Sequence, residues 1–138
     1  MAANTSPSCT SETFVAFQGA NGDLWTYTKS SNIATDTGLG MAPNTSPAVW
    51  RNEIAFQTNT NQMWLYASEA NVLHKYGLGM MPNTSPSITQ REVGQQIEIA
   101  FQANNSDLYP FRPQPEQGLD TGLGMAAGSS PSIAAEGS

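Results

Sequence analysis

Three pairs of aromatic residues have the chemistry to bind a flat, hydroxylated ligand. The members of each pair are separated by one residue, so both lie on one face if the segment is a β-strand. The pairs are Trp25 with Tyr27, Trp64 with Tyr66, and Tyr109 with Phe111. An aromatic ring can cover the apolar face of a sugar while fixed polar groups bind its hydroxyls. Packing between structural units is the alternative for every ring, and it is favoured for Phe111.

Short polar segments before the aromatic pairs add side chains that can bind hydroxyl groups. They supply Asn21, Asp23, Asn61, Asn105 and Asp107. Asn, Asp, Gly and Ser also tolerate the backbone angles of a tight hairpin, so turn capping is favoured for Asp23 and Asp107. Two Asp-Thr pairs stand just before Gly-Leu-Gly segments: Asp36 with Thr37, and Asp120 with Thr121. These pairs are candidates either for binding sugar hydroxyls or for capping the local turn.

The chain lacks the residue clusters that catalysis or metal binding requires. It has one histidine, His74, and one cysteine, Cys9, which excludes an internal disulfide. We expect His74 in a surface loop and Cys9 as a small buried residue of a first strand. Asp23 and Asp107 belong to different units, whereas carboxylates that share acid–base work lie close together. We therefore expect no enzyme, no metal and no cofactor.

The candidate residues recur because the chain is built from repeats. The segment Ala-Phe-Gln ends at Gln18, Gln57 and Gln102, at spacings of 39 and 45 residues, and Gly-Leu-Gly-Met keeps the same spacings. The units are 1–40, 41–79 and 80–124, with a partial fourth unit at 125–138, and they make a single repeat domain at 1–138. The third unit is longer through insertions at 91–96 and 112–118, which are expected to be loops. The first insertion, with Arg91 and Glu92, is the one place where a unique site would break the repeat.

Each unit is expected to form four short β-strands. The first follows Ser-Pro, as at 47–50 and 86–89, and the second contains Ala-Phe-Gln, as at 53–57 and 98–102. The third carries the aromatic pair, and the fourth leads into Gly-Leu-Gly. A period of ~40–45 residues with four strands fits a β-propeller blade. A β-trefoil is the alternative all-β fold, because it is built from three units.

Composition limits the partners. The net charge is −6 and only five residues are Lys or Arg, so we expect neither nucleic acid nor an anionic membrane surface as a partner. No apolar stretch approaches the ~20 residues of a membrane span. No secretory signal precedes the first unit, so the localisation is unknown, although action outside the cell or at the cell surface is favoured.

The order of the motifs resembles a blade of the tectonin-like β-propeller lectins, and bacterial fucose-binding propeller lectins have a similar blade. The resemblance is carried by Pro-Ala-Val at 47–49, Glu-Ile-Ala-Phe-Gln at 53–57, Met-Trp-Leu-Tyr at 63–66, and the Gly-Leu-Gly that leads to a new Ser-Pro. It implies three four-stranded propeller blades per chain. It also implies a carbohydrate-binding protein without catalysis, with cell-surface glycans, including fucosylated ones, as ligands.

Three blades are fewer than the roughly four to eight that close a propeller. We therefore expect a homo-oligomer, with a dimer of six blades favoured, and a multivalent lectin with equivalent sites in each unit. The half-copies at 4–8 and 129–133 compete for the same strand position, so one of them is either exchanged with a neighbouring chain or left unpaired. The alternative function is a self-assembling propeller fragment or engineered repeat scaffold that binds no ligand.

Overall fold

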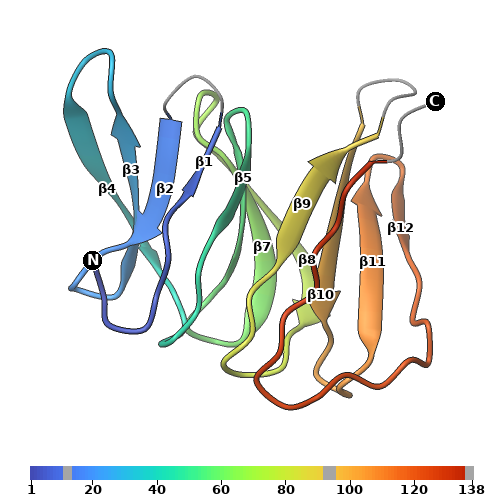
Figure 1. Cartoon of the computed structure of the whole chain (residues 1–138). Helices are drawn as coiled ribbons and strands as arrows, with labels where there is room; N and C mark the ends of the chain where they lie inside the picture. The colour runs from blue at the N-terminus through green and yellow to red at the C-terminus, as the bar shows by residue number, and fades with distance from the viewer. Residues whose placement is uncertain (11–13, 92–95, 136–138) are drawn as a thin grey trace.

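β-strands make up the fold in the computed structural model, which describes residues 1–10, 14–91 and 96–135. No helix occurs within these ranges. The strands are β1 (Ser8–Cys9), β2 (Phe14–Gln18), β3 (Asp23–Thr28), β4 (Ile33–Gly40), β5 (Ala48–Trp50), β6 (Glu53–Gln57), β7 (Gln62–Ala67), β8 (Val72–Gly79), β9 (Ser87–Gln90), β10 (Ile97–Gln102), β11 (Leu108–Pro113) and β12 (Glu116–Gly118). They form three antiparallel sheets of four strands each, which stand in a row (Figure 1).

Each sheet is drawn from one repeat unit. The first contains β1 to β4, the second β5 to β8 and the third β9 to β12, always with neighbours in chain order. Equivalent residues have equivalent cross-strand partners: Phe17 lies opposite Trp25, Phe56 opposite Trp64 and Phe101 opposite Tyr109. The prediction of an all-β chain with four strands per unit is confirmed. The alternating apolar pattern of the second and third strands carried that prediction.

The hydrophobic core lies between neighbouring sheets, because the two faces of a strand point at different neighbours. The same positions meet at both junctions: Ala16 and Leu24 pack with Ile54 and Phe56, and Ala55 and Met63 pack with Ile99 and Phe101. Phe56 and Phe101 are fully buried. Phe17 holds the equivalent position, so the repeat predicts it in the core as well, but it is only half-buried because it lies on the outer face of the first sheet, at the end of the row.

A ladder of hydrogen bonds joins the Asn-Thr-Ser-Pro corners of successive units. The amide of Ser6 donates to Ser46 Oγ, that of Ser46 to Ser85 Oγ, and that of Ser85 to Ser130 Oγ, each at 2.8 Å. Within the corner, the threonine hydroxyl donates to a carbonyl three residues earlier, as Thr45 does to Ala42 at 2.7 Å. The asparagines of the corner have φ of 59°, 61° and 63°, a left-handed conformation that Asn tolerates better than most residues. The repeated motif therefore fixes the spacing of the sheets.

The structure corrects several local expectations. Cys9 is exposed, because β1 belongs to the first sheet and its outer face has no neighbour among the described residues. His74 lies within β8, opposite Leu65, and not in a loop. The insertion at 112–118 is a strand hairpin, since Arg112 pairs with Gln117 and Pro113 with Glu116. Residues 92–95 of the other insertion, including Glu92, lie outside the described residues.

Ser85→Ala tests the corner ladder. We expect it to lower the free energy of unfolding by about 1–2 kcal/mol, because the part-buried amide of Ser46 loses its acceptor. Urea denaturation measures the change. The matched control is Ser30→Ala at an exposed serine in the turn after β3, expected to change stability by less than about 0.5 kcal/mol. Equal effects of the two substitutions on the free energy of unfolding would show that the serine hydrogen bonds of the ladder do not stabilise the fold.

Candidate ligand-binding cleft

A cleft of about 1400 Å³ opens between the first and second sheets. Thr26 and Thr28 of β3 line it on one side, and Tyr66 of β7 lines it on the other. Arg51 and Glu69, from the turns that follow β5 and β7, add charged groups. Phe14 and Trp50 also line the cleft, so the lining combines aromatic rings with hydroxyl and charged groups.

Strand alternation places these side chains at the junction. Thr26 and Thr28 follow Leu24 in steps of two along β3, and Leu24 is fully buried in the core between the first two sheets. Tyr66 follows Trp64 by the same step along β7, and both rings pack against that core. The cleft thus continues the hydrophobic core along the same two strands, with threonine in place of larger apolar residues.

Hydrogen bonds hold the polar lining in place. Tyr66 Oη donates to Asn71 Oδ1 at 2.8 Å, which leaves the phenolic oxygen able to accept from a ligand. Asn52 Nδ2 donates to Glu69 Oε2 at 2.7 Å. The Asn52 carbonyl accepts from both the amide and the hydroxyl of Ser68, at 2.9 and 3.0 Å. Side chains that are ordered before a ligand arrives lose less conformational entropy when it binds.

The equivalent space between the second and third sheets is filled. Leu65, Tyr76 and Phe111 stand at the positions of Thr26, Thr37 and Tyr66. The rings of Tyr76 and Phe111 lie 4.7 Å apart, and Leu65 and Phe111 are buried. Burial, together with the nearby carboxylates of Glu53 and Glu116, raises the pKa of Tyr76 to about 12. One junction is therefore a cleft and the other is core.

The structure brings the predicted polar residues of the first unit together. Asn21 Nδ2 donates to Asp36 Oδ2 at 2.9 Å and to Asp23 Oδ2 at 3.2 Å. Trp25 Nε1 donates to Asn21 Oδ1 at 3.1 Å. These residues form one cluster around the asparagine amide, and Trp25 lies on the outer face of the first sheet.

The third unit contains the same cluster. Asn105 Nδ2 donates to Asp120 Oδ2 at 2.7 Å and to Asp107 Oδ2 at 3.3 Å. The pKa of Asp107 is raised by desolvation and by its hydrogen bond with Asp120. The pKa of Asp120 is lowered by the amide of Gly122 and then by Asn105. The Asn105 amide therefore bridges the two carboxylates.

The Asp-Thr pairs brace the corners of their own chain. Asp36 Oδ1 accepts from the amide of Gly38 at 2.9 Å, and Thr37 Oγ1 donates to the Leu24 carbonyl at 2.7 Å. In the third unit, Asp120 Oδ1 accepts from Gly122 at 3.0 Å and Thr121 Oγ1 donates to Leu108 at 2.8 Å. These contacts support the turn-capping interpretation of both pairs. Asp36 and Thr37 also line the cleft.

The second unit lacks the acidic cluster. Trp64 Nε1 donates to Gln62 Oε1 at 3.2 Å, and Lys75 Nζ lies 4.4 Å from the centre of the Trp64 ring. Asn61 is not the equivalent of Asn21: it has a φ of 59° and occupies the turn position of Gly22. Thr60 stands at the position of Asn21, and Asn61 serves the hairpin turn.

The predicted aromatic residues divide between core and surface. Trp64 and Tyr109 pack against the two inter-sheet cores, and Phe111 is buried as predicted. Trp25 and Tyr27 lie on the outer face of the first sheet. Tyr66 is the predicted aromatic that lines the cleft. The second ring of the pair therefore has a different environment in each unit. Tyr27 lies on the outer face, Tyr66 lines the cleft and Phe111 is buried in the core.

Sequence reasoning missed most of the cleft. The missed lining residues include Thr26, Thr28, Arg51, Asn52 and Glu69. The repeat points to residues that the units share, whereas the residues at these positions differ from unit to unit. The usable signal was the contrast between Thr26 and Leu65 at one position and between Tyr66 and Phe111 at another.

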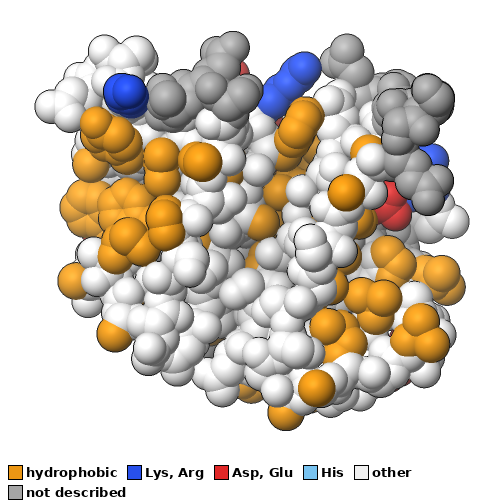
Figure 2. Space-filling model, viewed as in Figure 1, with side chains coloured by type: hydrophobic (Ala, Val, Ile, Leu, Met, Phe, Trp, Pro, Cys, Tyr) orange, Lys and Arg blue, Asp and Glu red, His pale blue; other side chains and the backbone are white. Residues whose placement is uncertain are grey.

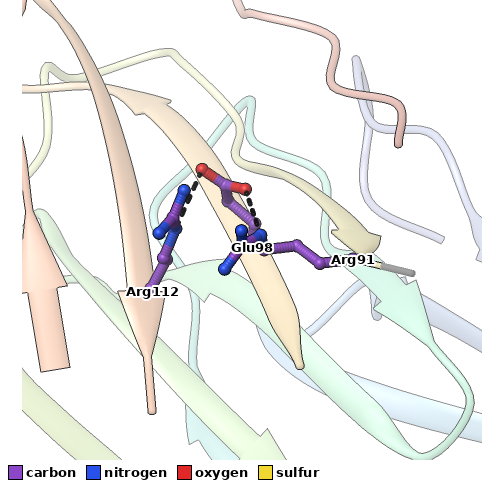
Figure 3. Close-up of polar contacts among 3 residues, drawn as sticks. All are labelled: Arg91, Glu98 and Arg112. Carbon is purple, nitrogen blue, oxygen red and sulfur yellow. Dashed lines mark ion pairs between the residues drawn. The ribbon is translucent and has the colours of Figure 1, made fainter. Parts of the chain in front are cut away.

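Ion pairs of Glu98 link β10 with β11 and with the residue that follows β9. Glu98 of β10 pairs with Arg91 at 3.7 Å and with Arg112 at 3.6 Å, so Arg91 is held in an ion pair across the third sheet (Figure 3). Among residues 1–10, 14–91 and 96–135, no group of three His, Cys, Asp or Glu could hold a metal ion. None of these ranges forms a helix long and apolar enough to cross a membrane.

Comparison with protein-family models, with curated proteins and with solved structures found no match to this chain. The resemblance to tectonin-like lectins therefore rests on the motifs alone.

Glu53→Gln tests the electrostatics of the filled junction. Burial raises the pKa of Glu53, His74 opposes the rise, and Glu53 Oε2 is buried without a hydrogen-bond partner among the described residues. Because the folded pKa is raised, the protein loses stability as pH rises above 4.5 through that pKa. We expect Glu53→Gln to raise Tm at pH 7 by a few degrees, and the gain to vanish at lower pH.

Thermal unfolding between pH 4 and pH 8 measures this effect. Glu98→Gln is the matched control, since that carboxylate faces two arginines. It should not raise Tm at pH 7. A lower Tm for Glu53→Gln at pH 7, or a gain that does not change with pH, would contradict the assignment.

Proposed function

We propose that this protein binds carbohydrate, without catalysis, in the cleft between the first and second sheets. The observation that carries the proposal is the combination of the Tyr66 ring with ordered hydroxyl and amide groups in one open cleft. Sugars need an aromatic surface for their C–H groups and polar partners for their hydroxyls.

The cleft also suits a ligand larger than one sugar ring. Its volume exceeds the ~300–1,000 Å³ of typical small-molecule sites, which leaves room for a branched or extended glycan. Asp36 and Glu69 carry negative charge and Arg51 carries positive charge, so the lining is weakly negative and does not favour a strongly anionic ligand. Neutral cell-surface glycans, including fucosylated ones, fit these properties.

We further propose that the three sheets are blades of a β-propeller similar to the tectonin-like lectins. Separate four-stranded sheets packed face to face in a row support this fold over the β-trefoil. Three blades require completion by a second copy of the chain. Assembly places several clefts on one particle, which raises avidity by ~10²–10⁴ on a glycan-coated surface.

A scaffold without a ligand is the second candidate function. It is favoured by the environment of Trp64 and Tyr109, which pack against the cores and serve the fold. If the protein is such a scaffold, Tyr66→Phe changes no ligand affinity, because no ligand binds.

A glycan array with free-sugar competition tests the proposal. We expect competable binding of the folded protein to a related set of glycans. Thr26→Leu with Tyr66→Phe copies the filled junction into the cleft, and should reduce binding at least tenfold because it removes both space and a hydroxyl. Fluorescence titration with the best glycan measures the affinity.

Tyr76→Phe is the matched control, because it removes a phenolic hydroxyl from the filled junction. It should leave glycan binding unchanged. A blank array with folded protein would favour the scaffold function. Full binding by the double variant would place the sugar somewhere other than this cleft.

A further inference from the structure

We infer that residues 126–133 of one copy of this chain form the first strand of the first sheet of a second copy. The exchange joins copies head to tail and displaces residues 2–9 from that position. This inference concerns how copies join, and it does not rest on glycan binding.

Residues 126–133 already lie where the first strand of a further sheet belongs. The amide of Ser85 donates to Ser130 Oγ at 2.8 Å, the same bond that joins the earlier corners. The amide of Ile133 donates to Ser87 Oγ at 2.9 Å, just as the amide of Val49 donates to Ser8 Oγ at 3.1 Å. The segment therefore continues the row of first strands beside β9.

This segment has a first-strand position but no second strand. In the three sheets, the first strand pairs with the second through equivalent residues: Cys9 opposite Val15, Val49 opposite Ile54, and Ile88 opposite Ile99. In the described part of the chain, no strand pairs with residues 126–133. By repeat position, Ile133 requires a residue equivalent to Val15, Ile54 or Ile99.

The outer face of the first sheet supplies half of the missing interface. Val15 and Phe17 are half-exposed there, whereas their equivalents Ile54 and Phe56 are fully buried against the preceding sheet. The face that buries Ile54 and Phe56 is therefore the face that is uncovered in the first unit.

The outer face of the third sheet supplies the other half. Leu123 is 62% exposed, whereas its equivalents Leu39 and Leu78 pack against the inter-sheet cores. Met125 is half-exposed where Met41 and Met80 are buried. Hydrophobic side chains gather at both ends of the row (Figure 2). Each end thus carries one side of an interface that the chain forms twice internally, and a second copy carries the complement.

Backbone groups at the two ends are also complementary. The amide of Asn59 donates to the Gly40 carbonyl, and that of Asn104 to the Gly79 carbonyl, both at 3.2 Å. The next members of this series are the Gly124 carbonyl of one copy and the Ala20 amide of a second copy. Two copies joined in this way at both ends close a ring of six sheets, within the range of roughly four to eight in propellers.

Exchange is favoured over simple docking because β1 is the weakest first strand. Among the described residues it pairs with β2 through two residue pairs, whereas β5 pairs with β6 through three and β9 pairs with β10 through four. Cys9 stands where the other units have Val49 and Ile88, and Ile133 restores a large aliphatic side chain at that position. Burying the larger apolar side chain gains more free energy.

Disulfide trapping tests the exchange. Directly opposite residues of antiparallel strands have Cα atoms ~4.5–5.5 Å apart, which suits a disulfide. In a Cys9→Ala background, Val15→Cys with Ile133→Cys should form a reductant-sensitive dimer in diamide, seen on a non-reducing gel. Val15→Cys alone and Val15→Cys with Ala134→Cys are the matched controls, and should give at most a tenth as much dimer.

A second variant separates exchange from docking without exchange. With Cys9 retained beside Val15→Cys and Ile133→Cys, exchange predicts an intermolecular disulfide between the two introduced cysteines, read by peptide mass spectrometry. An intramolecular disulfide between Cys9 and the cysteine introduced in β2, with no intermolecular product, would overturn the proposal. Sedimentation of the unmodified chain gives an independent check: we expect twice the 14.7 kDa chain mass, and a monomer at micromolar concentration would also overturn it.

Discussion

Every unit of this protein depends on a neighbouring sheet. A four-stranded sheet with apolar residues on both faces cannot bury both of them alone, and isolated small sheets are only marginally stable. The second sheet meets the condition, since it buries Phe56 on one side and Ala55 on the other. The first and third sheets each have one covered face and one open face. The gradient of burial along the row follows from this requirement.

The corners at the Asn-Thr-Ser-Pro and Gly-Leu-Gly segments hold neighbouring sheets close enough for that packing. Gly40 and Gly79 end the fourth strands of their units, and a Cβ atom at either would lie 2.6 or 2.5 Å from the side-chain Nδ2 atom of Asn59 or Asn104. The asparagine side chain of the next unit therefore lies directly against the glycine, and a side chain at the glycine position would have to displace it. The serine ladder holds the same spacing at the other strand. Most of the repeated motifs of the sequence therefore serve to join neighbouring sheets.

The repeat made the fold predictable and concealed the candidate site. The alternation in Glu-Ile-Ala-Phe-Gln and the turn residues after it gave strands, hairpins and sheet membership without any long-range information. The cleft arises because Thr26 and Tyr66, which face each other across the first junction, together fill less volume than Leu65 and Phe111 at the second junction. Such contacts join residues 40 or more positions apart, as 26 and 66 are, and a single unit does not contain them. The exposure of Cys9 was missed for a related reason, because it depends on the place of β1 at the end of the row.

Packing and binding compete for the same positions in this design. A ring at the position of Tyr66 can cover a neighbouring sheet or a ligand, but a ring fully buried in a junction cannot reach a ligand. In the third unit the ring at this position serves packing, because Phe111 lies against Tyr76. At the first junction the same position keeps a hydroxyl, and the facing threonines leave space beside it. Duplicating a unit therefore multiplies the core but not necessarily the site. Under the proposed function, a ligand site forms at a junction whose facing side chains leave space, as at the first junction, so the number of sites depends on the pairs of faces that meet and not on the number of repeats.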